Sequence, residues 1–198
     1  MIRHPFEQIN LRDGELYFAP DFLTETDSRQ YLDRIVRNSS WQQQRIKSFG
    51  KTIRLPRLTA WHGDPEAVYR YSGITNEPLP WTNELTEIKK RVEKACEATF
   101  NSVLLNRYRD GRDSVSWHAD DETALGEQPV IVSVSLGASR QFQMKHRFDT
   151  SQKCSLTLEN GSALVMRGAT QQYWLHQIPK TRKIVGERIN LTFRLVKR

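Results

Sequence analysis

The C-terminal segment 188–195 alternates strictly between apolar and polar residues, which is the pattern of a β-strand with two unlike faces. The apolar positions are Ile189, Leu191, Phe193 and Leu195, and the polar positions are Arg188, Asn190, Thr192 and Arg194. One face therefore packs into a core, while the other presents two guanidinium groups that need anionic partners. The competing interpretation of the polar face is the solvated outside of an edge strand.

The rest of the second half has the same strand-like pattern. From Ser102 onward, short alternating segments are separated by turn signals such as Asp110-Gly111 and Asn160-Gly161. The segments are 103–108, 130–136, 142–144, 154–158, 162–166, 172–177 and 187–196. Short strands in this number predict a sandwich or a jelly-roll barrel.

Two helices are expected in the first hundred residues. The first follows Phe22-Leu23, with Thr24 or Thr26 as its N-cap. The second begins near Thr82 and carries an apolar stripe of Leu85, Ile88, Val92 and Cys96, opposite a charged face. The predicted fold class is therefore mostly β with supporting helices (α+β), in a single domain over residues 1–198.

The remaining N-terminal segments predict one strand, one hairpin and one loop. Residues 15–18 read as a first strand. Segment 41–57 breaks at Ser48-Phe49-Gly50 and is expected to form a hairpin with basic residues on both limbs. An exposed Phe49 at such a tip resembles the wedges that enter a base stack, although a Phe folded onto the core is the rival interpretation. Segment 61–73 is expected to be a loop.

Composition places the chain among globular proteins and excludes two other classes. Of its 198 residues, 37% are hydrophobic and 27% charged, which fits neither a disordered nor a membrane chain. No apolar run approaches the roughly 20 residues that span a bilayer, and the start lacks the apolar stretch of a secretory signal. Cys96 and Cys154 stand far apart, so we expect reduced thiols in a reducing compartment. A monomer is expected.

The positive charge is concentrated in one stretch. The chain has a net charge of +7, and residues 29–57 contain eight basic residues against Asp33 alone, a local excess of seven. A basic patch of this kind is the electrostatic footprint of a nucleic-acid-binding protein. A solvated, solubilising face is an equally good interpretation of the charge alone.

His118, Asp120 and His176 form the most informative constellation. His118 and Asp120 are two residues apart, so in an extended segment their side chains share a face. Together with His176 they make two imidazoles and one carboxylate, the set that binds one face of an octahedral Fe(II) and leaves positions open for a co-substrate and O₂. The Arg pair of segment 188–195 would then hold a bound dicarboxylate. These features predict an iron- and 2-oxoglutarate-dependent oxygenase.

A His-x-Asp pair alone is weak evidence for a metal site, because most such pairs lie on the surface or are hydrogen-bonded to each other. The chain carries a second copy at His62-Gly63-Asp64, which stands against Pro65 and lacks strand alternation. We interpret this second pair as part of a loop rather than as a metal site. A zinc hydrolase using the same three ligands, with an open Zn²⁺ position, is an alternative to the iron enzyme.

At these residues the sequence resembles the AlkB family of alkylation-repair dioxygenases. The resemblance is carried by Asn106-Arg107-Tyr108, His118-Ala119-Asp120, His176 and the segment 188–194. The tip Ser48-Phe49-Gly50-Lys51 and the later Pro56-Arg57 further resemble the branch of the family that acts on double-stranded DNA. The resemblance implies a double-stranded β-helix (jelly-roll) core over 101–198, preceded by helices and a nucleotide-recognition hairpin and lid over 1–100.

The resemblance also implies roles for individual residues. Fe(II) would be bound by His118, Asp120 and His176, which are then the catalytic residues. The co-substrate 2-oxoglutarate would be held by Arg188 at its distal carboxylate, with Tyr108 and Asn190, and by Asn106 and Arg194 nearer the metal. Substrate-binding residues would be Phe49, Gly50, Lys51, Arg57, Tyr69, Tyr71, Asp121 and Glu122.

The implied reaction is oxidative demethylation of N1-methyladenine and N3-methylcytosine in DNA, with O₂ as co-substrate and formaldehyde, succinate and CO₂ as products. The implied partner is methylated, duplex DNA, with no membrane, in the cytoplasm of a bacterium or the nucleus of a eukaryote. The same chemistry on RNA is one alternative. A non-catalytic nucleic-acid-binding β-barrel is another, and it would bind in a salt-sensitive manner without forming succinate.

Overall fold

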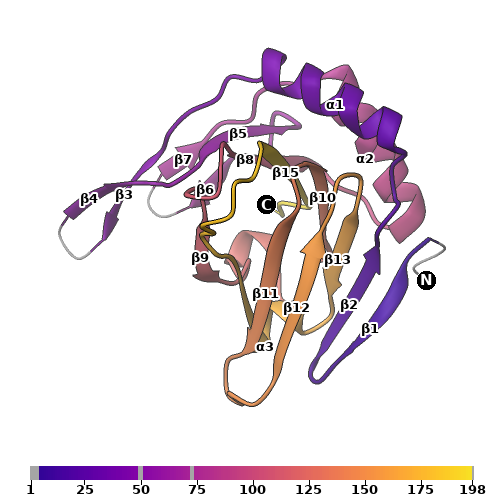
Figure 1. Cartoon of the computed structure of the whole chain (residues 1–198), viewed down its shortest axis with the longest axis vertical. Helices are drawn as coiled ribbons and strands as arrows, with labels where there is room; N and C mark the ends of the chain where they lie inside the picture. Colours follow the sequence, from indigo (N-terminus) through magenta and orange to yellow (C-terminus); the bar gives the residue numbers. More distant parts are fainter. Residues whose placement is uncertain (1–4, 49–50, 72–73, 198) are drawn as a thin grey trace.

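The computed structural model describes residues 5–48, 51–71 and 74–197. Within this part of the chain, most strands belong to two antiparallel sheets (Figure 1). The larger has seven strands in the order β1 (Glu7–Leu11), β2 (Gly14–Ala19), β13 (Ala163–Arg167), β10 (Ile131–Gly137), β15 (Arg188–Arg194), β8 (Ser102–Tyr108) and β5 (Leu58–Gly63). The smaller has four in the order β12 (Lys153–Leu158), β11 (Arg140–His146), β14 (Trp174–Ile178) and β9 (Val115–His118).

The two sheets face each other across an apolar layer. This layer joins Leu16, Ile131, Leu164 and Met166 of the large sheet to Phe142, Met144, Leu158, Trp174 and Ile178 of the small one, all at most 5% exposed. Because each strand alternates its side chains, one face of each sheet supplies this layer. The structure confirms the predicted fold class, a mostly β jelly-roll core with supporting helices.

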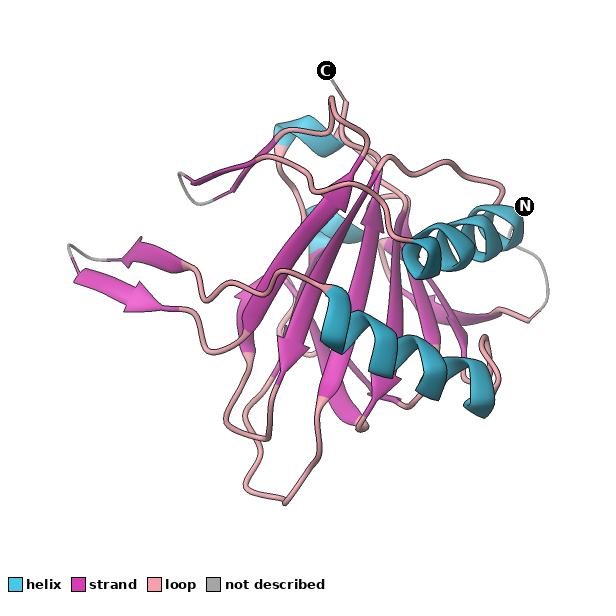
Figure 2. Ribbon diagram, turned by 90° about the horizontal axis from the view of Figure 1, so that it is seen from above, coloured by secondary structure: helices cyan, strands magenta, loops and turns pink. Residues whose placement is uncertain are grey.

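Two helices cover the other face of the large sheet (Figure 2). They are α1 (Glu25–Asn38) and α2 (Asn83–Cys96), as the sequence predicted. The stripe of α2 (Leu85, Ile88, Val92 and Cys96) is buried in one cluster with Tyr31 and Ile35 of α1 and with Val103, Leu105, Val132, Val134, Ile189, Leu191 and Phe193 of the sheet. The charged face of α2 therefore remains outside, as the 3.6-residue period requires.

Strand β15 lies inside the large sheet, between β10 and β8. All seven of its residues are buried. Its apolar side chains join the cluster beneath the helices, so its polar side chains must point to the opposite face, toward the small sheet. The edge-strand interpretation of this segment is thereby wrong. Leu195, which was expected on the apolar face, lies beyond the strand and is 39% exposed.

The N-terminal half contains two small hairpins that project from the same side of the molecule (Figures 1 and 2). The pairing of β3 (Arg45–Ser48) with β4 (Lys51–Arg54) confirms the expected hairpin, although its expected tip at Phe49 and Gly50 lies outside the described residues. The loop expected over 61–73 is wrong. That segment contains the end of β5 and then β6 (Tyr69–Tyr71), which pairs with β7 (Ile74–Asn76).

The large sheet draws strands from both halves of the sequence. β1, β2 and β5 precede residue 100, yet they extend the sheet on both of its sides. The sheet is therefore not confined to the predicted core range of 101–198. A short 3₁₀ turn η1 (Thr123–Leu125) and a single-turn α3 (Thr170–Tyr173) complete the elements of the described ranges. No helix in those ranges is long and apolar enough to cross a membrane.

Helix α1 provides a test of the local structure. The Thr24 side chain accepts a hydrogen bond from the Asp27 backbone N–H at 3.1 Å, whereas Thr26, the other expected cap, lies inside the first turn. We expect Thr24→Ala to lower the free energy of unfolding by about 1 kcal/mol and the Tm by about 2–4 °C. Thr26→Ala is the matched control and should leave the Tm unchanged or slightly raised. Equal losses in both variants would contradict this assignment.

Candidate active site

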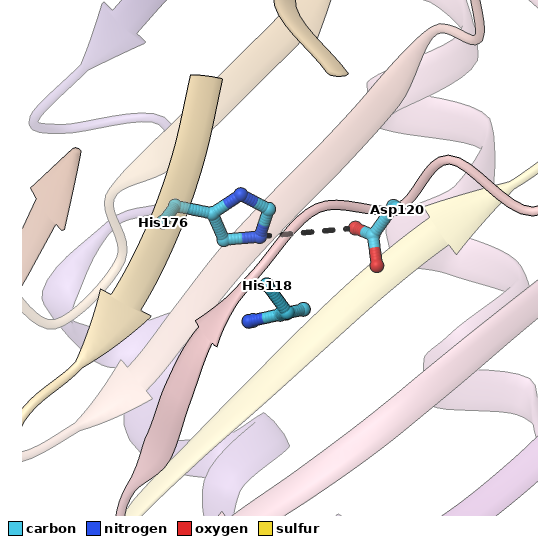
Figure 3. Close-up of side chains that lie close together, drawn as sticks. All are labelled: His118, Asp120 and His176. Atoms are coloured by element: carbon cyan, nitrogen blue, oxygen red, sulfur yellow. Dashed lines mark ion pairs between the residues drawn. The ribbon is translucent and has the colours of Figure 1, made fainter. Parts of the chain in front are cut away.

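Three metal-ligating side chains meet between the two sheets (Figure 3). His118 ends β9 and His176 lies opposite it on β14, so the two are cross-strand neighbours with ring centroids 4.3 Å apart. Asp120 follows two residues after His118, just beyond the strand. The ligand atoms all lie within 4.8 Å of one another, and His176 Nε2 is 4.0 Å from Asp120 Oδ2. The predicted constellation is therefore brought together.

Neighbouring groups orient the ligands. His118 Nδ1 is 2.8 Å from the Ser116 carbonyl, so this nitrogen carries the proton and Nε2 keeps its lone pair. Arg194 Nη2 donates to Asp120 Oδ1 at 2.7 Å, which leaves Oδ2 as the oxygen closest to His176. The Asp120 backbone N–H donates to Gln171 Oε1 at 2.9 Å, and Gln171 is itself buried. Asp120 is therefore held at both its carboxylate and its backbone N–H.

Burial and charge set the ionisation of the ligands. Burial opposes the charge on Asp120, but Arg194 and the two histidines outweigh it and lower the pKa of Asp120 to about 2. Burial, followed by the neighbouring His118, lowers the pKa of His176 to about 3. Near neutral pH the site therefore contains a carboxylate and a neutral imidazole, which are the forms that bind metal.

The three side chains fit a single divalent ion. Neighbouring ligand atoms about 2.1 Å from one octahedral ion are separated by about 3.0 Å, and the ligand atoms here lie within 4.8 Å of one another. Binding of an ion would draw the three side chains closer together. Two imidazole nitrogens and one carboxylate on one side are the facial arrangement of non-haem Fe(II).

A cavity of about 70 Å³ adjoins the ligands. Its walls include the predicted residues His118, Asp120, His176, Asn106, Tyr108, Asn190, Arg194 and Arg57. They also include polar residues that were not predicted, namely Gln44, Thr59, Ser133, Gln177 and Thr192, and apolar residues from both sheets, namely Trp61, Leu104, Val115, Phe142, Leu158, Met166 and Ile178. One compartment therefore joins the metal ligands to the polar face of β15.

Arg188 is completely buried beside this cavity. Its Nη2 donates to Ser135 Oγ at 2.8 Å and to Asn190 Oδ1 at 2.7 Å, and its guanidinium carbon lies 5.2 Å from the Tyr108 ring centroid. Nε and Nη1 have no hydrogen-bond partner among the described residues. Burial lowers the pKa of Arg188 to about 10, so the group stays charged near neutral pH. A buried cation with two unsatisfied N–H groups fits a bound carboxylate.

The predicted substrate-binding residues are dispersed. Arg57 is buried in the cavity wall and donates from Nε to Asn106 Oδ1 at 2.7 Å. Asp121 is exposed and forms an ion pair with Arg147 at 2.5 Å, while Glu122 is half-buried with no hydrogen-bond partner for Oε2. Neither acid lines the cavity. Lys51 lies in β4 and Tyr69 and Tyr71 in β6; Phe49 and Gly50 lie outside the described residues.

Ser133 and Ser135 were missed although the sequence carries a signal for them. Both serines alternate with apolar residues in segment 131–136, and that pattern indicates a buried strand. A buried hydroxyl needs a hydrogen-bond partner. Ser133 Oγ donates to Asn190 Oδ1 at 2.7 Å, and Ser135 Oγ accepts from Arg188. Gln44 and Thr59 had no comparable signal in the sequence. Their place in the cavity wall depends on contacts with distant parts of the chain, such as the pairing of Thr59 with Asn106.

Comparisons with known proteins identify the family of the chain. Residues 15–194 match the family model of the 2OG-Fe(II) oxygenase superfamily. The chain is 40% identical over 186 residues to the mouse (Mus musculus) alpha-ketoglutarate-dependent dioxygenase alkB homolog 3, covering 89% of this chain and 64% of that protein. It is 37% identical over 174 residues to the human (Homo sapiens) DNA oxidative demethylase ALKBH2, covering 84% of this chain and 67% of that protein.

The fold has a counterpart among solved structures. The structure of OsALKBH1 superimposes with a TM-score of 0.68, covering 96% of this chain and all of that one, at 19% identity. This likeness supports the architecture alone. The chain spans slightly less than two thirds of the length of the mouse relative.

The ligand assignment predicts the metal affinity of variants. His118→Ala should weaken Mn(II) binding at least about tenfold, because one of three protein ligands is lost. The control is His62→Gln in the second His-x-Asp pair, where the ring bonds to the Pro80 carbonyl at 2.7 Å and lies outside the cavity. Titration followed by the electron paramagnetic resonance signal of free Mn(II) measures both. Comparable weakening by the two variants would contradict the assignment.

Proposed function

The chain belongs to the AlkB family within the 2OG-Fe(II) oxygenase superfamily, and from that premise we propose that it is an Fe(II)- and 2-oxoglutarate-dependent dioxygenase that removes methyl groups from bases in DNA. One observation carries the proposal. His118, Asp120 and His176 converge beside a cavity whose neighbouring Arg188 is buried, charged and without a carboxylate partner among the described residues. A metal ion would occupy the position between the three ligands, and a diacid would supply a carboxylate for Arg188.

The chain's own residues would hold the metal and prepare its ligands. His118 and His176 would bind through Nε2 and Asp120 through Oδ2. Arg194 keeps the other oxygen of Asp120 engaged at 2.7 Å, which favours a single metal-oxygen contact. When bound, Fe(II) with 2-oxoglutarate supplies O₂ activation, so that 2-oxoglutarate becomes succinate and CO₂ while the N-methyl group is hydroxylated and leaves as formaldehyde.

The polar face of β15 would bind the diacid. Arg188 offers the free N–H groups Nε and Nη1 to the distal carboxylate. Tyr108 and Asn190 line the cavity beside it, because Tyr108 is the cross-strand partner of Arg188 and Asn190 lies two residues further along the same face of β15. The apolar residues Leu158 and Ile178 from the small sheet would cover the methylene groups and exclude water.

The proposed substrate is a positively charged methylated base, N1-methyladenine or N3-methylcytosine. Such bases pair poorly and therefore leave the stack at low cost. Glu122, two residues after Asp120, has no hydrogen-bond partner for Oε2 among the described residues, and in this proposal its side chain turns toward the cationic base. Asp121 is a weaker candidate, because Arg147 already neutralises it. The human relative ALKBH2 is a DNA oxidative demethylase by name, which supports DNA as the substrate class.

Duplex DNA is the proposed form of the substrate. Support comes from the hairpins β3–β4 and β6–β7, which project from one side (Figure 2) and carry basic and aromatic residues in their sequences. In this proposal Phe49 and Gly50 open the duplex, Lys51 and Arg57 contact the nucleotide, and Tyr69 and Tyr71 stack on the base. We further propose that the protein acts as a monomer, in the cytoplasm of a bacterium or the nucleus of a eukaryote.

A single-turnover experiment tests the proposed function. Protein, Fe(II) and 2-oxoglutarate are mixed without oxygen, and O₂ is then added together with an oligonucleotide that carries one N1-methyladenine. Restored adenine and succinate in equal amounts are expected, with neither formed by His118→Ala. Parallel duplex, single-stranded and RNA oligonucleotides distinguish the substrate forms. Binding without succinate would refute the enzyme, and turnover of RNA alone would refute the assignment to DNA.

The role of Arg188 gives a separate prediction. Arg188→Ala removes the charge opposite the distal carboxylate and should raise the KM for 2-oxoglutarate by about 10- to 100-fold, since hydrogen bonds to charged groups contribute about 1.5–3 kcal/mol. Mn(II) affinity should be retained, because Arg188 touches no metal ligand. Initial rates of succinate formation over a range of 2-oxoglutarate concentrations measure the effect. An unchanged KM would remove Arg188 from the diacid site.

A further inference from the structure

A second arginine, Arg140, is buried close to Arg188. Arg140 begins β11 in the small sheet and is 4% exposed, and within the described residues it has no carboxylate within ion-pair distance. Burying two cations without directly paired acids is unfavourable, because each loses its hydration. Burial, and to a smaller extent repulsion by Arg140, lowers the pKa of Arg188. Asp113 and Asp110 attract Arg140 electrostatically, but among the described residues neither arginine has a carboxylate within ion-pair distance.

The hydrogen bonds of Arg140 connect two loops. Nη1 donates to the Asp110 carbonyl at 3.2 Å, and Nη2 donates to the carbonyls of Asp113 at 2.8 Å and Pro179 at 2.7 Å. Asp110 and Asp113 lie in the loop that follows β8, and Pro179 comes directly after β14. Since β8 carries Tyr108 and β14 carries His176, this one side chain fixes the ends of two of the strands that line the cavity.

Both guanidinium groups lie over the same aromatic ring. The Tyr108 ring centroid is 5.5 Å from the guanidinium carbon of Arg140 and 5.2 Å from that of Arg188. Tyr108 is 2% exposed and lines the cavity, whereas neither arginine does. Such cation–π contacts are strongest when the cation is desolvated, as both guanidinium groups are here. Arg140 therefore contacts the cavity wall only indirectly, through the ring of Tyr108.

We propose that Arg140 is a positioning residue for the diacid co-substrate, which holds Tyr108 against Arg188 and adds a second positive charge to the end of the cavity that receives the distal carboxylate. This inference rests on the proposed function, and it assigns no direct contact between Arg140 and the diacid. A role limited to fastening the two loops is the alternative. That role predicts a loss of stability without a change in the discrimination between ligands.

Two ligands separate these roles. 2-Oxoglutarate carries a distal carboxylate, whereas oxalate can chelate the metal and has none. We would measure the binding of each to the Mn(II)-loaded protein by isothermal titration calorimetry without oxygen, so that no turnover occurs. Arg140→Met should raise the Kd for 2-oxoglutarate about tenfold and leave the Kd for oxalate within about twofold. Arg140→Lys keeps the charge and should recover part of the loss.

Arg91→Met is the matched control. Arg91 also lies over a tyrosine ring, Tyr31, at 5.8 Å, but between the two helices and away from the cavity. It should lower the Tm without changing either Kd. Three results would overturn the inference: an unchanged Kd for 2-oxoglutarate in both Arg140 variants, an equal loss for 2-oxoglutarate and oxalate, or no recovery in Arg140→Lys.

The same titration distinguishes failure of this inference from failure of the proposed function. If the wild-type protein binds 2-oxoglutarate and the Arg140 variants bind it equally well, only the role of Arg140 is lost. If the wild-type protein binds Mn(II) but not 2-oxoglutarate, the proposed function fails and the role of Arg140 fails with it. Thermal unfolding of every variant shows whether a loss of binding reflects a loss of folded protein.

Discussion

The burial of strand β15 on both faces is the constraint on which the rest of the structure depends. Its apolar side chains lie beneath two helices, and its polar side chains face the small sheet. A cation or amide in that position requires partners, because water is excluded. Ser133 and Ser135 of β10 and Asn106 of β8 lie on the flanking strands, and the first two bond directly to side chains of β15. The polar side chains of β15 therefore require polar residues at the facing positions of the flanking strands.

The small sheet contributes the metal ligands because of its register. Pairing of β14 with β9 sets His176 opposite His118, and a shift of one residue would turn one imidazole to the outer face. Arg194 links this arrangement to β15 through Asp120. The two sheets are therefore joined by an ion pair as well as by the apolar layer, and the metal ligands share an electrostatic environment with the candidate diacid site.

Much of this arrangement follows from strand alternation and could be predicted. The faces of segment 188–194, the pairing of His118 with Asp120 and the stripe of α2 all depend on periods of 2.0 or 3.6 residues. Segment 58–63 could not be recognised, because β5 is buried on both faces and shows no alternation. His62 was consequently assigned to a loop, although it lies in that strand. β1 was missed as well, because none of its side chains is buried and the difference in exposure between its two faces is small. Long-range partners such as Arg140 and Tyr108 have no local signature.

Adjacent strands also join the two candidate binding regions. Asn106 pairs with Asn190 of β15 on one side and with Thr59 of β5 on the other, and its Oδ1 accepts from Arg57. Arg57, assigned to the substrate, therefore shares a wall with residues assigned to the diacid. Because Arg57 also donates to the Ser114 carbonyl at 3.3 Å, its position depends on the loop that leads into β9 and His118. Arg57 therefore connects the wall that contains Asn106 with the loop that leads to His118.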